Sequence, residues 1–281
     1  YDQAAHDYLS SVDLLKQIKT GFPDTDEAFI AAYKIPQYLY HASHNYIKSE
    51  NWGGAIEVLE EILSEYPESD FYEDAVDAAA DAYLEHASGF GSRSEYEDAI
   101  SWFIKYLEIV PEPLRDFSLD LKIKQIFEGT PPQLIREFAD SQYYNGNYQT
   151  AVFLYTVLVE FNPGYIEEVA SFIVDSKIFL AILSPYNEML QPKTGRYIEL
   201  EGESMLIFKN DTVFSMASYL KGPGSYLLNI EAGESAEIEI KSGEYELLVE
   251  LDTGDLLPFL GNRTYYEKRT YTEVFEIQSQ Q

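Results

Sequence analysis

The sequence predicts a chain in two parts, an N-terminal α-α superhelix of paired helices followed by a C-terminal antiparallel β-sandwich. Three observations predict this fold class. A pattern of spaced apolar residues occurs four times between residues 8 and 163, and helical periodicity changes to strand-like alternation after residue 195. The hydrophobic content of 46% is also high enough for packed cores. We expect a helical domain over residues 1–187, a linker over 188–195 and an all-β domain over 196–281.

The repeated pattern consists of an aromatic residue, a small residue, two large apolar residues and a proline. The first four lie on one face of a helix with 3.6 residues per turn, and the proline ends that helix. The small residues recur about 44 to 52 residues apart, as in arrays of helical hairpins. The four copies are Tyr8, Ser11, Leu15, Ile18 and Pro23; Trp52, Ala55, Leu59, Ile62 and Pro67; Tyr96, Ala99, Phe103, Tyr106 and Pro111; and Tyr148, Ala151, Tyr155, Leu158 and Pro163.

A second helix is expected before each patterned helix, with Ser43, Ala80 and Ala139 as its small residues. Before the copy that starts at Tyr96, the extra residues 88–94 are predicted to loop out between the two helices. An inserted helix is expected within residues 112–130, and it accounts for the longer offset to the last copy. Residues 165–183 are expected to form a capping helix that covers the last apolar face of the array.

The spacing of small, aromatic, large apolar and proline residues resembles the tetratricopeptide repeat. The junctions at residues 22–26 and 66–70 are similar to those of bacterial envelope repeat proteins, namely outer-membrane-assembly lipoproteins and Tol-Pal-associated repeat proteins. This resemblance implies an extracytoplasmic location, periplasmic or at the cell surface of a bacterium. The chain starts at Tyr1 rather than Met, which leaves room for a signal peptide or a lipid-bearing cysteine upstream.

In tetratricopeptide repeats the first helix of each pair lines a concave groove, and the resemblance carries this role over to this chain. The partner-binding residues it implies are Gln37, Tyr40, His44, Lys48, Asp74, Asp77, Asp81, Glu85, Arg136, Asp140 and Tyr144. The four acidic residues from 74 to 85 share one helix face, where they repel one another unless a positive group lies opposite. We expect this stripe to receive a segment that carries Lys or Arg. The alternative is an ordinary solvated face in a chain of net charge −30.

The charge of the whole chain bears on its partners. With a net charge of −30 and a pI near 4.3, the surface repels phosphate backbones and anionic lipids. Nucleic acid and bare membrane are therefore not expected as partners. No apolar run reaches the ~18 residues of a transmembrane segment. There are no cysteines, which excludes disulfides and thiolate chemistry.

The sequence holds no recognisable catalytic constellation. A Gly-x-Ser-x-Gly nucleophile motif is missing, and all four histidines fall in predicted helices. Carboxylate pairs of the kind that glycosidases use stay open, because Asp and Glu are abundant. His41 and His44 are one helical turn apart, yet two imidazoles make an incomplete metal site. We therefore expect that the chain is not an enzyme and that it has no catalytic residue, no metal site and no cofactor.

The C-terminal part alternates apolar and polar residues, as strands with one buried face do. Ile238 and Ile240 alternate with charged residues, and glycine-containing turns separate about seven expected strands. The glycine turns resemble those of a small β-sandwich module found on bacterial secreted proteins. The repeat pattern does not explain Tyr265, Tyr266 and Tyr271, so we interpret them as candidate glycan-facing residues.

Together these features predict a non-enzymatic protein–protein interaction scaffold of the bacterial cell envelope. A partner peptide or helix would bind in the concave groove of the repeats, and the acidic stripe favours a basic partner. The alternative is a cell-surface carbohydrate-binding protein that uses the aromatic residues of the β domain.

Overall fold

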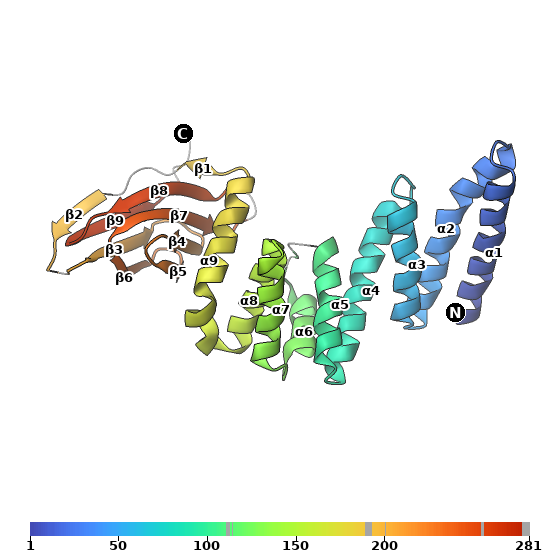
Figure 1. The fold of residues 1–281 in the computed structure, drawn as a ribbon, viewed down its shortest axis with the longest axis horizontal. Helices are drawn as coiled ribbons and strands as arrows, with labels where there is room; N and C mark the ends of the chain where they lie inside the picture. The colour runs from blue at the N-terminus through green and yellow to red at the C-terminus, as the bar shows by residue number, and fades with distance from the viewer. Residues whose placement is uncertain (111–112, 114, 189–192, 200, 254–255, 277–281) are drawn as a thin grey trace. The chain divides into compact units, whose positions relative to one another are not determined.

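The computed structural model describes residues 1–110, 113, 115–188, 193–199, 201–253 and 256–276. In this part of the chain helices come first and strands follow, which confirms the predicted order of an α region and a β region (Figure 1). Internal contacts divide the chain into two compact units, Tyr1–Leu134 and Ile135–Gln281. This division falls earlier than the linker expected at residues 188–195, and it groups the last helices with the strands.

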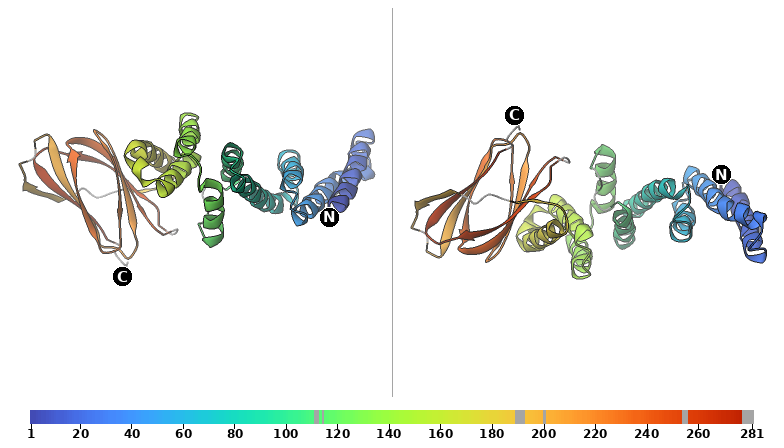
Figure 2. Two further views of the ribbon diagram at one scale, coloured as in Figure 1. Left: turned by 90° about the horizontal axis from the view of Figure 1, so that it is seen from below. Right: turned by 90° about the horizontal axis from the view of Figure 1, so that it is seen from above.

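The first unit is built from helices that pack against their neighbours in sequence. α1 contacts α2, α2 contacts α3, α3 contacts α4 and α4 contacts α5, and these consecutive helices lie side by side in Figures 1 and 2. The helices are α1 (Asp2–Gly21), α2 (Asp26–Lys48), α3 (Trp52–Glu65), α4 (Tyr72–Ser92), α5 (Tyr96–Ile109) and α6 (Phe117–Phe127), and α7 (Pro132–Tyr144) starts at the end of the unit.

The repeated sequence pattern corresponds to a repeated local structure. α3, α5 and α8 (Tyr148–Phe161) each begin at the aromatic residue of the pattern and end two residues before its proline. Their small residues, Ala55, Ala99 and Ala151, are completely buried. The residue that follows each helix has a similar backbone conformation, with φ of −133°, −122° and −140° at Tyr66, Val110 and Asn162.

The turn before each of these helices is also repeated. Glu50, Ser94 and Gly146 occupy the left-handed region, with φ of 59°, 62° and 81°. The next backbone N–H closes the preceding helix in the manner of a Schellman motif. The three bonds run from Asn51 N to Tyr46 O, from Glu95 N to Phe90 O and from Asn147 N to Gln142 O. Only the glycine adopts this conformation without a steric cost from Cβ.

Helix α4 corrects the loop expected over residues 88–94. The helix continues to Ser92, so most of these residues add helical turns. Their small side chains let α6 pack closely: Ala87, Ser88 and Gly91 are buried, and α6 contacts α4. A serine- and glycine-rich segment is typical of a loop. Here the segment is mostly helical, and its small side chains leave room for α6 to pack against it.

α6 is the inserted helix expected within residues 112–130. The Asp116 side chain caps it, because its Oδ1 accepts a 2.8 Å hydrogen bond from the Leu119 N–H. Ile123 and Ile126 are fully buried, and the Phe127 ring meets the Phe103 ring edge to face at 5.2 Å. These contacts fasten α6 to both helices of the preceding pair.

The second unit contains the rest of α7, α8, a 3-10 turn (Pro163–Tyr165), α9 (Ile166–Leu183) and the strands. The described strands form a five-stranded sheet of order β1-β8-β7-β4-β5 and a four-stranded sheet of order β2-β9-β3-β6. They are β1 (Asn187–Glu188), β2 (Lys193–Tyr197), β3 (Glu203–Asn210), β4 (Met216–Lys221), β5 (Ser225–Ile230), β6 (Ser235–Lys241), β7 (Gly243–Leu251), β8 (Phe259–Tyr265) and β9 (Arg269–Phe275).

The sheets are not purely antiparallel, which corrects one part of the expectation. β3 pairs with β9 in parallel, with Leu206 opposite Tyr271, and the short β1 is parallel to β8. The other described pairings are antiparallel. The two strands of each parallel pair are far apart in the sequence, and strands of both sheets come between them.

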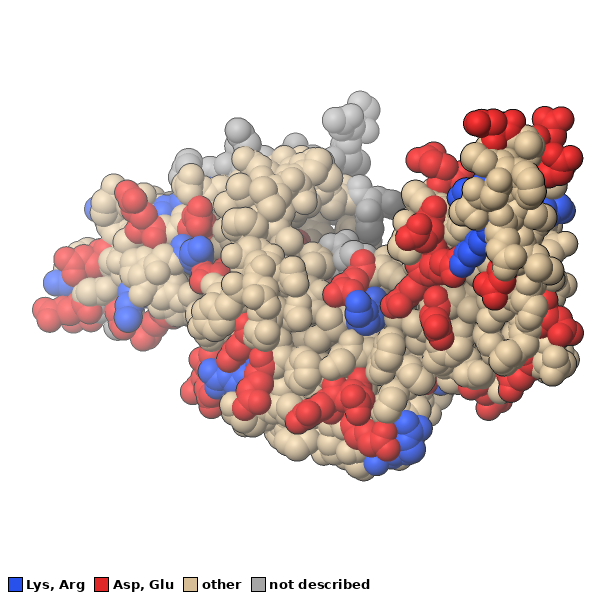
Figure 3. All heavy atoms as spheres, turned by 45° about the vertical axis from the view of Figure 1, so that its right-hand side comes forward, with Lys and Arg blue, Asp and Glu red and all other residues tan. Residues whose placement is uncertain are grey.

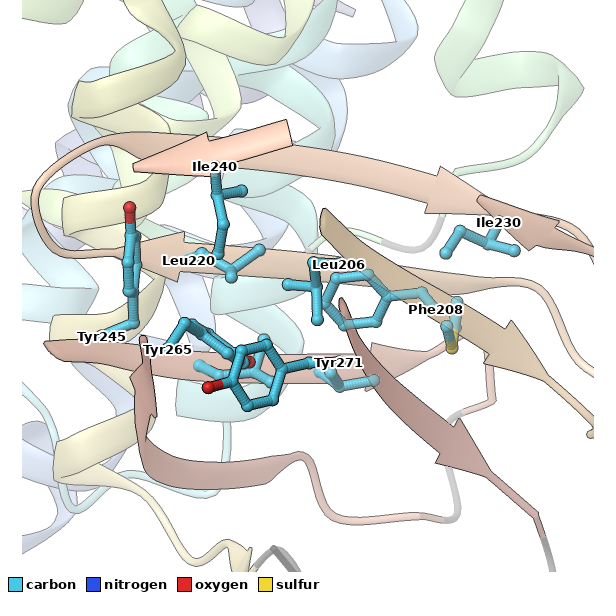
Figure 4. Packing of buried hydrophobic residues seen from close by; sticks show 11 residues of the cluster. Leu206, Phe208, Leu220, Ile230, Ile240, Tyr245, Tyr265 and Tyr271 are labelled. Carbon is cyan, nitrogen blue, oxygen red and sulfur yellow. The ribbon is translucent and has the colours of Figure 1, made fainter. Parts of the chain in front are cut away.

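One hydrophobic cluster draws side chains from both sheets (Figure 4). Leu206 and Phe208 of β3 enter it from the four-stranded sheet, while Leu220 and Leu247 enter from the five-stranded sheet, and all four are fully buried. Alternate residues of each strand therefore point into this shared core, as the alternation in the sequence predicts.

Helix α9 covers the opposite face of the five-stranded sheet, where it contacts β4, β5 and β7. Tyr219 and Leu248 are directly paired on that face, and they are 6% and 0% exposed. The Lys177 Nζ lies 5.6 Å above the Tyr219 ring and 2.8 Å from a carboxylate oxygen of Glu250. Because α9 also contacts α8, this one helix joins the last helical pair to the strands.

Candidate partner-binding surface

The four acidic residues that the sequence singles out lie along α4 in the first unit, and we call Asp74, Asp77, Asp81 and Glu85 the acidic face. The three aspartates are exposed and Glu85 is half-buried. Desolvation, followed by the like charges of Asp77 and Glu85, raises the pKa of Asp81. The carboxylates are thus close enough to repel one another. Over the side of the molecule seen in Figure 3, acidic side chains outnumber basic ones.

One end of the acidic face has a cationic partner. Lys122 of α6 places its Nζ 2.5 Å from an oxygen of Glu85 and 3.4 Å from the Ser88 hydroxyl. No ion pair within the described residues involves Asp74, Asp77 or Asp81. The inserted helix therefore neutralises one carboxylate, and the part of the chain that the structure describes offers the other three no counter-charge.

Tyr40 of α2 faces the start of the acidic face. Desolvation and then the charges of Asp74 and Asp77 raise the pKa of Tyr40. Its ring lies 5.7 Å from Phe71 and 5.4 Å from His44, measured between ring centroids. The structure thus brings the expected groove residues of α2 and α4 together, with aromatic rings beside carboxylates.

Two other expected groove residues of α2 are engaged locally. The Gln37 side chain accepts a 3.0 Å hydrogen bond from Lys34, and the Lys48 Nζ lies 5.9 Å above the Tyr1 ring. Neither contact reaches the acidic face. Tyr40 is the α2 residue that lies beside the acidic face, and the exposed His44 packs on its ring.

A cavity of about 320 Å³ lies beside this surface, and sequence reasoning missed it. It forms where α2 meets the α3–α4 junction. Its lining residues are Ala32, Tyr33, Pro36, Glu65, Tyr66, Pro67, Glu68, Ser69, Asp70 and Phe71. The aromatic-Pro-acidic junction was the available signal, but the sequence alone does not place it against α2.

The expected groove residues of α7 belong to the second unit. Arg136 forms ion pairs with Glu168 of α9 and, at 3.7 Å, with Asp140. Asp140 in turn accepts a 2.6 Å hydrogen bond from the Tyr155 hydroxyl. Arg136 and Asp140 are therefore both paired within the second unit. Tyr144, in contrast, is 74% exposed and lies beside the rings of Tyr143 and Phe172.

The glycan-facing interpretation of the β-domain tyrosines is wrong for two of the three. Tyr265 and Tyr271 are 1% and 3% exposed and belong to the core between the sheets, so neither can stack on a sugar. Tyr266 is 65% exposed. The reason is strand alternation: β8 and β9 turn Tyr265 and Tyr271 inward, and the hydroxyl of Tyr271 accepts a hydrogen bond from the Tyr266 N–H.

A charged pair is buried next to these tyrosines. Arg263 Nε lies 2.8 Å from Glu273 Oε1, and both side chains are almost completely buried. The Tyr265 hydroxyl donates to the same oxygen at 2.9 Å. Burial raises the pKa of Glu273, although Arg263 and Tyr265 act in the opposite direction. This network specifies the packing of β8 against β9.

The histidines of α2 pack against tyrosine rings. His41 packs against Tyr8 and His44 against Tyr40, with ring centroids 5.4 Å apart in both cases. Across the described residues, no group of three or more histidine and carboxylate side chains could hold a metal ion. No helix in the described ranges is long and apolar enough to cross a membrane.

Of the comparisons with known proteins, the one with solved structures gives a match. No family model matches the sequence, and no curated protein is significantly similar to it. Among solved structures, the chain is similar to the Pseudomonas fluorescens alkylpurine DNA glycosylase AlkC bound to DNA that contains an abasic site analogue. The TM-score is 0.20 and the identity 9%, over 92% of this chain and 97% of that chain.

This finding corrects two expectations, that the chain is not an enzyme and that nucleic acid is not a partner. A DNA-bound enzyme is among its structural neighbours, so neither exclusion is retained. With a TM-score of 0.20, the likeness carries no argument for the same activity or the same ligand.

Proposed function

We propose that the helical part is a superhelical array of tetratricopeptide-like repeats that serves as a protein–protein interaction scaffold. Its acidic face would bind a peptide or helix that carries Lys or Arg. Support for the array comes from α3, α5 and α8, which begin at equivalent aromatic residues, bury equivalent alanines and follow equivalent turns. The two sheets with their shared core favour a β-sandwich for the remainder.

The observation that carries the proposal is the set of three carboxylates without a counter-charge next to an aromatic surface. Asp74, Asp77 and Asp81 follow one another at helical spacing, so their charges lie about one turn, or ~5.4 Å, apart. A partner helix with basic residues at the same spacing would place one cation against each carboxylate. Tyr40 and Phe71 offer rings on which apolar or cationic side chains pack.

Electrostatic complementarity of this kind governs encounter and specificity more than total affinity. The proposed complex should therefore form quickly and weaken as salt rises, since the exposed aspartates are screened beyond roughly 8 Å at physiological ionic strength. Desolvation is the main cause of the raised pKa of Asp81, and a bound cation would offset the repulsion from Asp77 and Glu85 that adds to it.

The proposal places the protein in the bacterial cell envelope, periplasmic or at the cell surface. Its support is the resemblance of the Phe22–Asp26 and Tyr66–Asp70 junctions to those of envelope repeat proteins. In this setting the strands would position the array, since α9 contacts both α8 and the five-stranded sheet. Fractionation of the native cells tests the location, and recovery in the cytoplasmic fraction alone would contradict it.

Binding is tested with a fluorescein-labelled amphipathic peptide of about four helical turns that carries Lys at three- and four-residue spacing. We expect fluorescence anisotropy to show saturable binding that is at least ~tenfold weaker for the Asp77→Lys, Asp81→Lys double variant. The matched control reverses the exposed Asp24 and Glu234, which changes the net charge equally away from the acidic face.

A scrambled peptide of the same composition separates recognition from general attraction. The proposal requires it to bind more weakly than the patterned peptide, because its cations no longer match the helical spacing. Equal binding of the two peptides, or equal loss in the control and the Asp77→Lys, Asp81→Lys variant, would reject the acidic face as the binding site.

A further inference from the structure

We propose that the cavity between α2 and the α3–α4 junction is an anchor pocket for a single Arg or Lys side chain of the bound segment. This inference rests on the proposed function and names the residue that the segment inserts at one end of the acidic face. The cavity measures about 320 Å³, which is at the lower limit for small-ligand sites and roomy enough for one long side chain.

The walls of the pocket suit the aliphatic stem and the planar head of such a side chain. Tyr33 and Pro36 come from α2, and Phe71 closes the opposite side. Long cationic side chains bury their methylene groups on apolar walls and keep the charge at the rim. Aromatic faces also attract guanidinium and ammonium groups. The same junction already shows this contact, because Lys19 Nζ lies 5.5 Å above the Tyr66 ring.

The rim of the pocket supplies the negative charge. Glu65, Glu68 and Asp70 line it and are exposed. In the described ranges, no ion pair involves any of the three. An anionic or phosphorylated side chain would face three carboxylates, so charge complementarity selects a cation.

One polar atom of the lining lacks a partner. Ser69 Oγ is buried, and among the described residues no group hydrogen bonds to it. The aromatic wall and the acidic rim are the observations that select a cationic side chain.

The pocket is continuous with the acidic face. Phe71 lines the pocket and also contacts Tyr40, which faces Asp74 and Asp77. Asp70 lies in the turn just before α4, four residues ahead of Asp74. A segment with its cationic side chain in the pocket would therefore continue along the three aspartates that lack a counter-charge.

The test uses blocked amino acids rather than the unidentified partner. N-acetyl-arginine amide is titrated into the full chain labelled with ¹⁵N, and the amide signals of Ser69, Asp70 and Phe71 are followed. We expect saturable shifts centred on these residues, with N-acetyl-citrulline amide binding at least ~tenfold more weakly because it lacks the charge. Equal binding of the two compounds, or tighter binding of N-acetyl-norleucine amide, would overturn the proposal.

Variants locate the effect. Glu68→Gln with Asp70→Asn, both at exposed positions, should weaken the arginine compound about tenfold, while Asp24→Asn should leave it unchanged. Tyr33→Ala should weaken it as well, because this 57% exposed ring forms a wall. Shifts spread over all acidic surfaces, or undiminished in the Glu68→Gln, Asp70→Asn variant, would reject the pocket.

The two proposals fail separately. If the Lys peptide binds and is lost on reversing Asp77 and Asp81, but the arginine compound does not bind, the pocket is rejected and the scaffold function stands. If the arginine compound binds in the pocket while the peptide shows no dependence on the acidic face, the pocket stands and the proposed function is rejected.

Discussion

Gly91 of α4 lies directly against the backbone of Gln125 in α6. A Cβ atom added at position 91 would stand 2.4 Å from the Gln125 carbonyl oxygen and 2.7 Å from the Ile126 Cα. Because backbone atoms cannot move aside cheaply, the inserted helix can dock only where α4 has no side chain.

Gly91→Ala is therefore expected to lower the free energy of unfolding by about 1–3 kcal/mol through overpacking. Gly89→Ala is the matched control: its nearest contact is the flexible end of Arg93 at 3.7 Å, so helix propensity should stabilise it by up to ~1 kcal/mol. Chemical unfolding followed by tryptophan fluorescence isolates this unit, because both tryptophans, Trp52 and Trp102, lie in it. A Gly91→Ala variant as stable as wild type would contradict the close docking.

The repeated left-handed turns give a second prediction. Ser94→Gly should stabilise the first unit by ~1 kcal/mol, since it relieves the steric cost of Cβ at a φ of 62°. Gly146→Ala should destabilise the second unit by ~1 kcal/mol for the same reason, although no atom lies within 4 Å of the added Cβ. Gly164→Ala, also in open space but without a positive φ, is the control. Amide hydrogen exchange of α5 and α8 provides the measurement for each unit.

The acidic face predicts a pH dependence of stability. The pKa of Asp81 is raised in the folded state, which means that folding disfavours its charged form. The charged carboxylate therefore lowers the free energy of unfolding above the raised folded pKa, and this loss is absent below the ordinary value of 3.8. Asp81→Asn should stabilise the first unit at pH 7 by a few tenths of a kcal/mol. This gain should disappear as the pH falls below 3.8. A gain that is constant with pH, or equal for Asp24→Asn, would show that desolvation and repulsion of the Asp81 carboxylate are not its cause.

The buried pair in the strands predicts a strong asymmetry between single and double substitutions. Glu273→Met leaves the Arg263 guanidinium buried without its carboxylate and should cost about 3–5 kcal/mol. Replacing both residues with Met should recover part of this loss, because two apolar side chains need no charge partner, whereas the buried Tyr265 hydroxyl still loses its acceptor. Near-UV circular dichroism of the tyrosines during unfolding is the measurement. A double variant as unstable as the single one would assign the loss to packing rather than charge.

The helices with the repeated pattern could be predicted because their signal is local. The aromatic residue, the buried alanine and the terminating proline lie within one segment, and α3 begins at Trp52 for that reason. The helical structure of most of residues 88–94 could not be predicted in the same way, because their serines and glycines are poor helix formers and the α6 helix that packs against them is distant in sequence.

The binding surface could be predicted only in part. The spacing of Asp74, Asp77 and Asp81 already indicates a shared face, and the structure adds the missing counter-charges. The pocket depends on Tyr33 and Pro36 of α2 lying beside residues 65–71 of the α3–α4 junction, and no periodicity in the sequence records that arrangement. The tyrosines of β8 and β9 were misjudged because counting aromatic residues does not tell which side of a strand faces the core.

Helix α9 also determines where the chain can be divided. A fragment that begins at residue 196 would expose Tyr219 and Leu248, which α9 shields from water, and would remove the partners of Glu250 and Lys221. Such a fragment should aggregate in solution, because it exposes an apolar patch. The shortest autonomous piece that contains the strands therefore has to begin upstream of Ile166, even though the composition of the sequence changes only some thirty residues later.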